Sequence, residues 1–250
     1  MGLMSAPFLL IQTRPEDALA DAEYEAFVRL SGLEERDVER FRLEAEPLPV
    51  GFENTWHQRY SALVLGGSPF TATDSDRSET QVRVEEELAR LMGVVIEKDL
   101  PFLGLCYGVG VLGLASGAVI DRTYSEPAGI SHISLTPEGL TDPLLAGVDP
   151  HFDAFVGHKE STTKLPPEAV LLATSGPAPV QMYKLKQNIY ATQFHPELDP
   201  AGLIARIEAY RENGYFDPED FDAIANIARN ADVTAAHRIL VNFAKTYLPR

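Results

Sequence analysis

The chain has 250 residues, 45% of them hydrophobic and 23% charged, and its formal net charge is -16. So acidic a surface repels phosphate backbones, which argues against nucleic acid as a partner, and the dispersed acidic residues indicate a solvated surface. A single cysteine excludes an internal disulfide framework, and no stretch has the pattern of a signal peptide or a membrane span. We therefore expect a cytoplasmic protein with no membrane partner.

In the first half of the chain, short apolar runs alternate with stretches of helical periodicity, which is the pattern of an α/β fold. The second helical stretch opens on Ser78, a good helix cap, and we expect it to stop at Gly93. Strands are predicted at 7–12, 41–46, 61–67 and 101–106, and helices at 16–31, 78–93 and from about Tyr107 to Ser116.

After residue 117 the pattern changes to shorter strands, and from residue 200 it becomes helical. No linker rich in Pro, Gly or Ser divides the chain, so we predict one domain over 1–200 with the helices of 201–250 packed on it. Strands are predicted within AVI, SHISLT, DAFVGH, AVLLATS, VQMYKL and NIYATQFH, and helices within AGLIARIEAYRENG, DPEDFDAIANIARN and DVTAAHRILVNFAKTYL.

The only cysteine, Cys106, stands between two glycines directly after an apolar run, in FLGLCYG. Gly104 and Gly108 permit a sharp turn from strand into helix, which would expose the side chain at the top of a sheet. The dipole of the following helix would then favour thiolate over thiol. Taken alone, the pentapeptide GLCYG fits a reactive cysteine and a buried structural one equally well.

A cysteine nucleophile needs a base and a group that orients the base. His195 follows the apolar run IYATQF, and Pro196 and Glu197 come directly after it, so an imidazole and a carboxylate can turn toward one cleft. His158 is the rival base, with Glu160 two residues further on. We expect His158 and Glu160 near the mouth of the cleft or at a partner surface.

Acyl transfer also needs N–H donors for the oxyanion. Gly66 and Gly67 end the strand predicted at 61–67, and the backbone of such small residues can approach a substrate oxygen. The second donor would be the N–H of Tyr107, at the start of the helix. Two glycines after a strand are also common in simple turns.

Taken in order, LVLGGSP, FLGLCYG and QFHPE resemble the oxyanion strand, the nucleophile elbow and the His-Pro-Glu segment of the class I, triad-type glutamine amidotransferases. The segments ISLTPEGLTDPLL and FVGHKESTTKLPPEAVLLATS look like those of stand-alone members related to the glutaminase domain of GMP synthase. The resemblance covers about residues 60–200. It implies a three-layer, flavodoxin-like α/β fold with a mostly parallel central sheet and flanking helices.

The resemblance also implies roles for individual residues. Cys106 would attack the carboxamide carbon of glutamine, His195 would generate the thiolate and protonate the leaving ammonia, and Glu197 would orient the imidazole. Gly67 and Tyr107 would donate backbone N–H groups to the oxyanion. A γ-glutamyl thioester would form and water would release glutamate, with no metal or organic cofactor.

One position departs from the family pattern. The family usually has a glutamine four residues after the cysteine that helps to hold the substrate, and here that residue is Gly110. Gly66 and Gly110 are therefore the substrate-binding positions that the sequence offers. Three functions stay open: a glutamine amidotransferase that passes ammonia to a separate synthetase chain, a hydrolase of another γ-glutamyl amide such as a γ-glutamyl polyamine, and a non-catalytic regulatory module.

Overall fold

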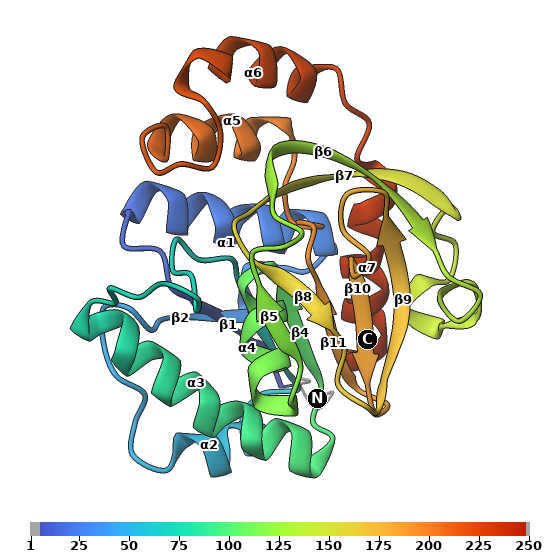
Figure 1. Ribbon diagram of the computed structural model, residues 1–250. Helices are drawn as coiled ribbons and strands as arrows, with labels where there is room; N and C mark the ends of the chain where they lie inside the picture. The colour runs from blue at the N-terminus through green and yellow to red at the C-terminus, as the bar shows by residue number, and fades with distance from the viewer. Residues whose placement is uncertain (1–5, 249–250) are drawn as a thin grey trace.

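A computed structural model describes residues 6–248, which form a large sheet with helices on both faces (Figure 1). Residues 1–5 and 249–250, at the outer ends of the predicted regions 1–200 and 201–250, lie outside the described part. The strands are β1 (Phe8–Gln12), β2 (Val38–Arg42), β3 (Ala62–Leu65), β4 (Phe102–Leu105), β5 (Val119–Asp121), β6 (Glu126–Leu135), β7 (His151–His158), β8 (Ser161–Lys164), β9 (Ala169–Ser175), β10 (Met182–Leu185) and β11 (Ile189–Thr192).

Nine of these strands form one mixed sheet in the order β2-β1-β3-β4-β11-β10-β9-β6-β7, and β5 pairs with β8 in a small second sheet. The strands from β2 to β11 in this order run parallel, whereas every later neighbour is antiparallel. The predicted α/β fold is therefore confirmed, with an antiparallel half added at one side of the parallel strands.

Helices cover both faces of the parallel strands, which makes the three layers. The helices are α1 (Asp17–Ser31), α2 (Phe52–Thr55), α3 (Glu79–Lys98), α4 (Tyr107–Ser116), α5 (Pro200–Ala209), α6 (Phe221–Arg229) and α7 (Thr234–Tyr247). Successive residues of a strand face opposite sides of a sheet. In β1, accordingly, Phe8 and Leu10 lie in the core with α1 and α7, whereas Leu9 and Ile11 lie in the core with α3 and α4.

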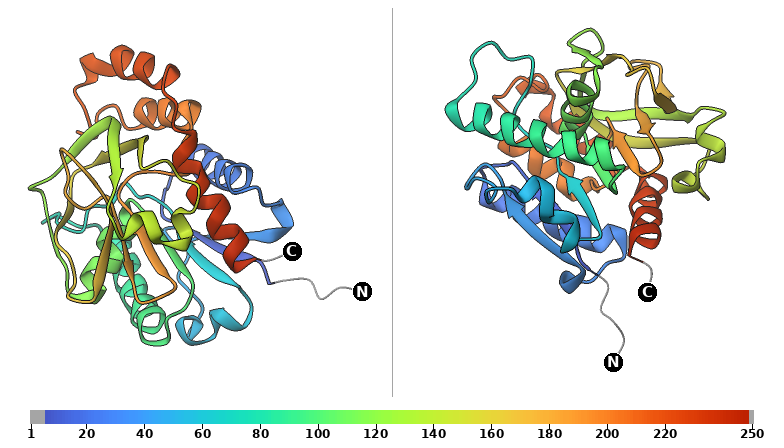
Figure 2. Two further views of the ribbon diagram at one scale, coloured as in Figure 1. Left: turned by 90° about the vertical axis from the view of Figure 1, so that its right-hand side faces the viewer. Right: turned by 90° about the horizontal axis from the view of Figure 1, so that it is seen from below.

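The last helices of the described chain pack in two places. Helix α7 runs beside α1 (Figure 2), and the ring of Phe243 meets that of Phe8 at a centroid distance of 5.6 Å. Helices α5 and α6 form a separate apolar cluster with Ala128 of β6 and Phe155 of β7, at the top of Figure 1. These two helices thus pack on β6 and β7, the two antiparallel strands at one edge of the sheet.

Three local predictions differ from the structure. Helix α3 continues past Gly93 to Lys98, because Gly93 faces open space while Val95 carries the apolar face onward. Asp99, with a φ of 52°, then ends the helix in the left-handed conformation. Strand β2 lies three residues earlier than the predicted 41–46, and the polar strand β8 was not predicted.

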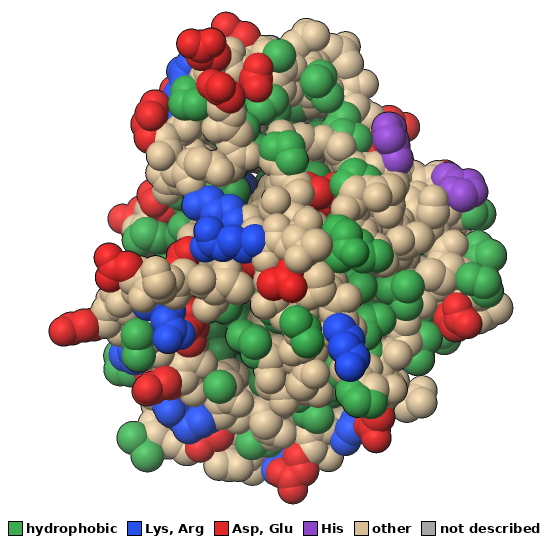
Figure 3. Space-filling model, viewed as in Figure 1, with side chains coloured by type: hydrophobic (Ala, Val, Ile, Leu, Met, Phe, Trp, Pro, Cys, Tyr) green, Lys and Arg blue, Asp and Glu red, His purple; other side chains and the backbone are tan. Residues whose placement is uncertain are grey.

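Acidic side chains are dispersed over the face drawn in Figure 3 and do not form one continuous patch. This arrangement fits a solvated surface. Among the described residues, no helix combines the length and the apolar character needed to cross a bilayer.

Candidate active site

The ends of four neighbouring parallel strands bring the candidate residues to one edge of the sheet. Arg14 follows β1, Gly67 follows β3, Cys106 follows β4 and His195 follows β11. Ligands of open α/β sheets bind at this carboxyl edge. Arg14, Cys106 and His195 line one cavity there. The candidate nucleophile and the candidate base are therefore neighbours in space.

The backbone at Cys106 is strained in the way the elbow prediction requires. Its φ of 50° and ψ of -85° are rare for a residue with a side chain. The turn is fixed by the N–H of Cys106, which donates to the carbonyl of Thr192 at 2.7 Å. A Cβ at Gly104 would lie 2.9 Å from the backbone of Gly108, whereas one at Gly108 would meet ordinary contacts. Gly104 is thus the glycine that this elbow needs for space.

The two predicted oxyanion donors are the backbone N–H groups of Tyr107, next to Cys106, and of Gly67, next to His195. Tyr107 is the first residue of α4, where a helical N–H has no partner in the helix. Within residues 6–248 the N–H of Gly67 also has no acceptor. A Cβ at Gly67 would lie 2.9 Å from Cε1 of His195, so only glycine fits there without a shift. Within residues 6–248 neither N–H has a backbone acceptor, and their role as oxyanion donors stays a prediction.

Gly66 has a different environment from Gly67. Its N–H donates to the carbonyl of Ile11 at 3.0 Å, and a Cβ there would lie 2.6 Å from the carboxylate of Glu23. The N–H is thus already used within the fold, and the Cα packs against a buried charge. The substrate-binding role of Gly66 therefore stays a prediction, and its N–H has no part in it.

His195 and Glu197 form a buried pair next to Cys106. Nδ1 of His195 lies 2.7 Å from Oε1 of Glu197. Since a carboxylate only accepts hydrogen bonds, Nδ1 carries the proton and Nε2 is left for the thiol. Burial lowers the pKa of His195, but the charges of Glu197 and Cys106 raise it by more than burial lowers it, so that the pKa rises from 6.5 to about 9. At neutral pH this electrostatic balance favours the protonated form of His195, held against the carboxylate of Glu197.

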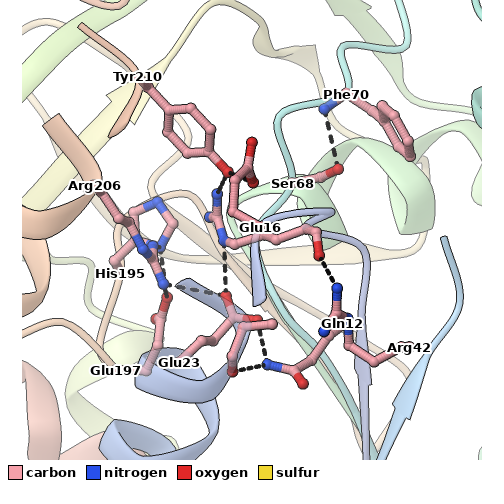
Figure 4. Close-up of polar contacts among 12 residues, drawn as sticks. Gln12, Glu16, Glu23, Arg42, Ser68, Phe70, His195, Glu197, Arg206 and Tyr210 are labelled. Atoms are coloured by element: carbon pink, nitrogen blue, oxygen red, sulfur yellow. Dashed lines mark hydrogen bonds and ion pairs between the residues drawn. The ribbon is translucent and has the colours of Figure 1, made fainter. Parts of the chain in front are cut away.

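The carboxylate of Glu197 is fully buried, yet it stays ionised. Burial raises its pKa, whereas the charges of His195 and Arg206 lower it, to about 2. Nη2 of Arg206, on α5, lies 3.2 Å from Oε1 of Glu197 and 3.1 Å from Oε1 of Glu23, on α1. Nε of Arg14 approaches the same atom of Glu23 at 3.3 Å. Figure 4 shows this chain of charges behind the imidazole.

Arg14, Glu23 and Arg206 were not among the predicted site residues. The signal that could have found them is a charge on an apolar helix face. Glu23 is 2% exposed and shares its face of α1 with Leu19 and Phe27. Buried charges are rare unless they are paired, so such a position indicates a partner elsewhere in the fold.

The rival base His158 has both of its ring nitrogens engaged. Nε2 lies 3.0 Å from Oε2 of Glu126, and Nδ1 lies 3.0 Å from the carbonyl oxygen of Glu160. Both partners are oxygen atoms that accept hydrogen bonds, so neither ring nitrogen is left free for a substrate. Burial raises the pKa of Glu126, but the hydrogen bonds from His158 and Gln181 lower it below its usual range. His158 is 4% exposed, and together with Glu160 it lines a cavity that also contains Cys106, so it lies beside the candidate nucleophile.

Gly110 borders a second cavity that also contains Cys106 and Glu160. A Cβ at Gly110 would lie 3.3 Å from Oε1 of Glu160. The Glu160 carboxylate accepts hydrogen bonds from the N–H groups of Ala72 at 3.0 Å and Thr73 at 2.9 Å. The space beside Gly110 is thus occupied by a fixed carboxylate and is not open.

The described part of the chain contains no group of three or more His, Cys, Asp or Glu side chains that could hold a metal ion. The groups around Cys106 are a nucleophile, a base, a carboxylate and N–H donors. This set is the one that acyl transfer requires.

Comparison with known proteins adds a family. The family model described as "Glutamine amidotransferase class-I" matches residues 31–203, more than half of the chain. The glutamine-hydrolysing GMP synthase of Hamiltonella defensa subsp. Acyrthosiphon pisum is 25% identical over 161 residues, which are 62% of this chain and 29% of that protein. That of Flavobacterium psychrophilum is 28% identical over 140 residues, 56% of this chain and 25% of that protein. The chain thus spans between 25% and 29% of the length of these relatives.

Solved structures agree on the fold. A glutamine amidotransferase from Thermotoga maritima aligns with a TM-score of 0.75 at 18% identity, over 98% of this chain and 99% of that one. The alignment extends over the end of α5 and over α6 and α7, which lie beyond the residues matched by the family model. At this identity the likeness shows the architecture only.

Proposed function

The chain belongs to the class I glutamine amidotransferase family, and on that premise we propose that it hydrolyses the carboxamide of glutamine through Cys106, His195 and Glu197. The observation that carries the proposal is the strained elbow of Cys106 beside the 2.7 Å pair of His195 and Glu197. Nucleophile, base and orienting carboxylate are the three parts of a catalytic triad.

In the first half-reaction the thiolate of Cys106 attacks the γ-carboxamide carbon. The negative oxygen that develops accepts hydrogen bonds from the N–H groups of Gly67 and Tyr107. The C–N bond then breaks, and Nε2–H of His195 gives its proton to the departing nitrogen. Ammonia leaves, and the γ-glutamyl group stays on the sulfur as a thioester.

In the second half-reaction water attacks the thioester carbon and His195 takes a proton from it. The C–S bond breaks, glutamate leaves, and Cys106 returns to the thiolate beside an imidazolium. Glu197 stabilises the imidazolium through both steps, which its low pKa of about 2 permits at neutral pH. All protons and electrons balance among the triad, the substrate and one water.

Glu160 supports an amino-acid substrate. Its carboxylate borders the cavity of Cys106 and, within the described residues, has no cationic partner. We propose that it faces the ammonium group of glutamine, in place of the side chain that Gly110 lacks. The relatives matched here are glutamine-hydrolysing GMP synthases, so we further propose that a synthetase, such as a partner chain, takes the ammonia.

A second candidate is hydrolysis of a γ-glutamyl amide with a cationic amine. The observation that favours it is again the uncompensated carboxylate of Glu160, which would attract either ammonium group. The two candidates share the thioester and differ only in the amine that leaves.

Intact-mass spectrometry during turnover tests both candidates. We expect a γ-glutamyl adduct on Cys106 with L-glutamine, and neither adduct nor glutamate with the Cys106→Ala variant. A panel of γ-glutamyl amines ranks the substrates in the same assay. If no γ-glutamyl compound leaves an adduct while iodoacetamide still alkylates Cys106, the proposed chemistry is refuted.

A further inference from the structure

A buried cluster of charges lies behind the imidazole, made of Arg14, Glu23, Arg206 and Glu197, and we propose that Arg206 is a positioning residue for the triad. It fixes the carboxylate of Glu197 and opposes the positive charge on His195. The proposal rests on the function proposed above in one respect, because its kinetic test measures the hydrolysis of glutamine. The cluster joins the segment after β1, helix α1 and helix α5.

The hydrogen bonds of Glu197 give Arg206 its first task. Oε1 accepts both from Nδ1 of His195 at 2.7 Å and from Nη2 of Arg206 at 3.2 Å. Among the described residues Oε2, though buried, has no hydrogen-bond partner. The carboxylate is thus held through one oxygen by two donors. Without the arginine, the imidazole would have to hold the carboxylate alone.

The second contact of Arg206 concerns charge. Its Nη1 lies 3.1 Å from Nδ1 of His195. When Nδ1 carries a proton for Glu197, both atoms are donors, so they make no hydrogen bond and two positive groups touch. Like charges at this separation repel, strongly so where water is excluded. Arg206 therefore weakens the hold of Glu197 on the proton of the imidazolium, which helps His195 to give a proton to a leaving amine.

Glu23 sets how strongly Arg206 acts. Its Oε1 accepts from Nη2 of Arg206 at 3.1 Å and from Nε of Arg14 at 3.3 Å, so it offsets part of both positive charges. Gln12 donates to the other oxygen of Glu23 at 3.1 Å. Arg14 is held from its other side by Tyr210, because Nη1 of Arg14 donates a hydrogen bond to the Tyr210 hydroxyl at 3.1 Å.

The elements around His195 bring few other charged groups. Helix α4 begins beside Cys106, and the loop after α5 brings Tyr215, whose pKa is raised by burial and by the charge of Cys106. The hydroxyl of Tyr210 also bonds Glu16 at 2.8 Å. Strand β7 contributes the carbonyl of Phe155, which accepts from the N–H of His195 at 2.8 Å. The balance at the imidazole is therefore set by the cluster and by Cys106.

Arg14, Glu23 and Arg206 all lie outside residues 31–203, which the family model matches. The triad residues lie inside that range. The support of the triad is thus built from the two ends of the chain, which the family pattern does not describe.

The first test is steady-state kinetics of the full chain with Arg206→Met. We expect kcat for glutamine to fall about tenfold or more and KM to change less than about threefold, because orientation and proton transfer suffer while substrate contacts stay. Arg206→Lys keeps the charge and should recover much of the loss. The matched control is Arg29→Met, which breaks the exposed pair of Arg29 with Asp199 that also links α1 to α5. An equal loss of kcat in the control variant would mean that Arg206 only holds α5 against α1, and would overturn its role as a positioning residue.

The second test does not need turnover. In chains that carry Cys106→Ala, ring nitrogen NMR shifts report the pKa of His195 directly. Arg206→Met removes a positive neighbour and should raise that pKa, whereas Glu23→Gln removes a negative one and should lower it. A merely structural role would not give opposite signs. Shifts of the same sign, or none, overturn the proposal.

The two tests separate the two proposals. If the unmodified chain releases no glutamate from any γ-glutamyl amide, the proposed function fails while the NMR test still decides the role of Arg206. If Arg206→Met does not fold, the sign of the shift in Glu23→Gln decides it alone, because this substitution removes the carboxylate that both arginines contact and leaves Arg206 with Glu197 only.

Discussion

Two buried His–Glu pairs flank Cys106, and they differ in what their second nitrogen does. In the pair of His195 and Glu197, one ring nitrogen bonds the carboxylate and the other is left for the thiol. In the pair of His158 and Glu126, both ring nitrogens are bound to acceptors of the protein. Only the first pair can exchange a proton with a substrate. Burial and a carboxylate partner alone do not make a histidine a base.

The two histidines look alike in the sequence, since each has a glutamate two residues further on. After His195 the chain turns, with the N–H of Leu198 donating to the carbonyl of His195 at 3.3 Å, and Glu197 folds back onto the ring. His158 instead ends a strand, and the carboxylate of Glu160 reaches away to the N–H groups of Ala72 and Thr73. The same spacing thus serves two purposes because the backbone differs.

The largest expected difference between the two pairs is in catalysis, and substituting each histidine in turn tests it. His195→Ala should lower kcat/KM for glutamine by about 10³-fold or more, because thiolate formation and proton donation are both lost. His158→Gln, which keeps one donor and one acceptor, should still form the thioester on Cys106. Thioester formation is followed by intact mass. Loss in His158→Gln with retention in His195→Ala would reverse the assignment.

The two pairs should differ in how their contributions to the free energy of unfolding depend on pH: one is lost at alkaline pH and the other at acid pH. The pKa of His195 is raised from 6.5 to about 9, so its contribution to stability is complete below pH 6.5 and is lost as the pH rises through 9. The pKa of Glu126 is lowered from 4.5, so its contribution is present above pH 4.5 and is lost as the pH falls further.

Two variants test this stability prediction. Each of His195→Ala and Glu126→Gln should destabilise the chain by about 3 kcal/mol at pH 6.5. The difference from the unmodified chain should shrink toward alkaline pH for the first variant and toward acid pH for the second. Urea unfolding at a series of pH values measures both. Parallel behaviour of the two variants would mean that the pairs are electrostatically equivalent.

Glu197→Gln should reduce kcat about 100-fold, since an amide neither stabilises the imidazolium nor fixes the tautomer of His195. The pKa of His195 should fall, because the carboxylate is one of the groups that raise it. The alkaline limb of the pH–rate profile should therefore move to lower pH. Glu160→Gln, in the other His-x-Glu segment, should leave that limb in place.

The smallest expected effect is at Gly110. Its Cβ position lies 3.3 Å from Oε1 of Glu160, so Gly110→Ala should displace that carboxylate by only a few tenths of an ångström. We expect KM for glutamine to rise less than about threefold, with no change in the rate of Cys106 alkylation. A large loss of alkylation would place Glu160 in the support of the nucleophile.

The sequence predicted best where apolar runs end at short turns. Strands β3 and β4 and helix α4 lie where expected, because Gly66, Gly67 and Cys106 interrupt strong patterns. Strand β8 was not predicted, because Ser161–Lys164 is polar and pairs only with β5. Gly93 misled because an exposed glycine weakens a helix without ending it.

The candidate site divides in the same way. Short sequence motifs contain Cys106, His195 and Glu197, so the residues next to them in the sequence were enough to predict them. Arg206 and Glu23 lie on separate helices and meet only after folding. A pattern of nearby residues carries no information on such a contact, apart from the oddity of a charge on an apolar face.

The position of Arg206 on α5 has a consequence for the order in which the protein is made. During synthesis Cys106, His195 and Glu197 all leave the ribosome before α5, which begins at Pro200. A nascent chain therefore holds its nucleophile and base before it holds Leu203 and Tyr210, which line the cavity. Domains fold as they emerge, so the cavity beside Cys106 is complete only after the segment that carries Leu203 and Tyr210 has been made and has packed.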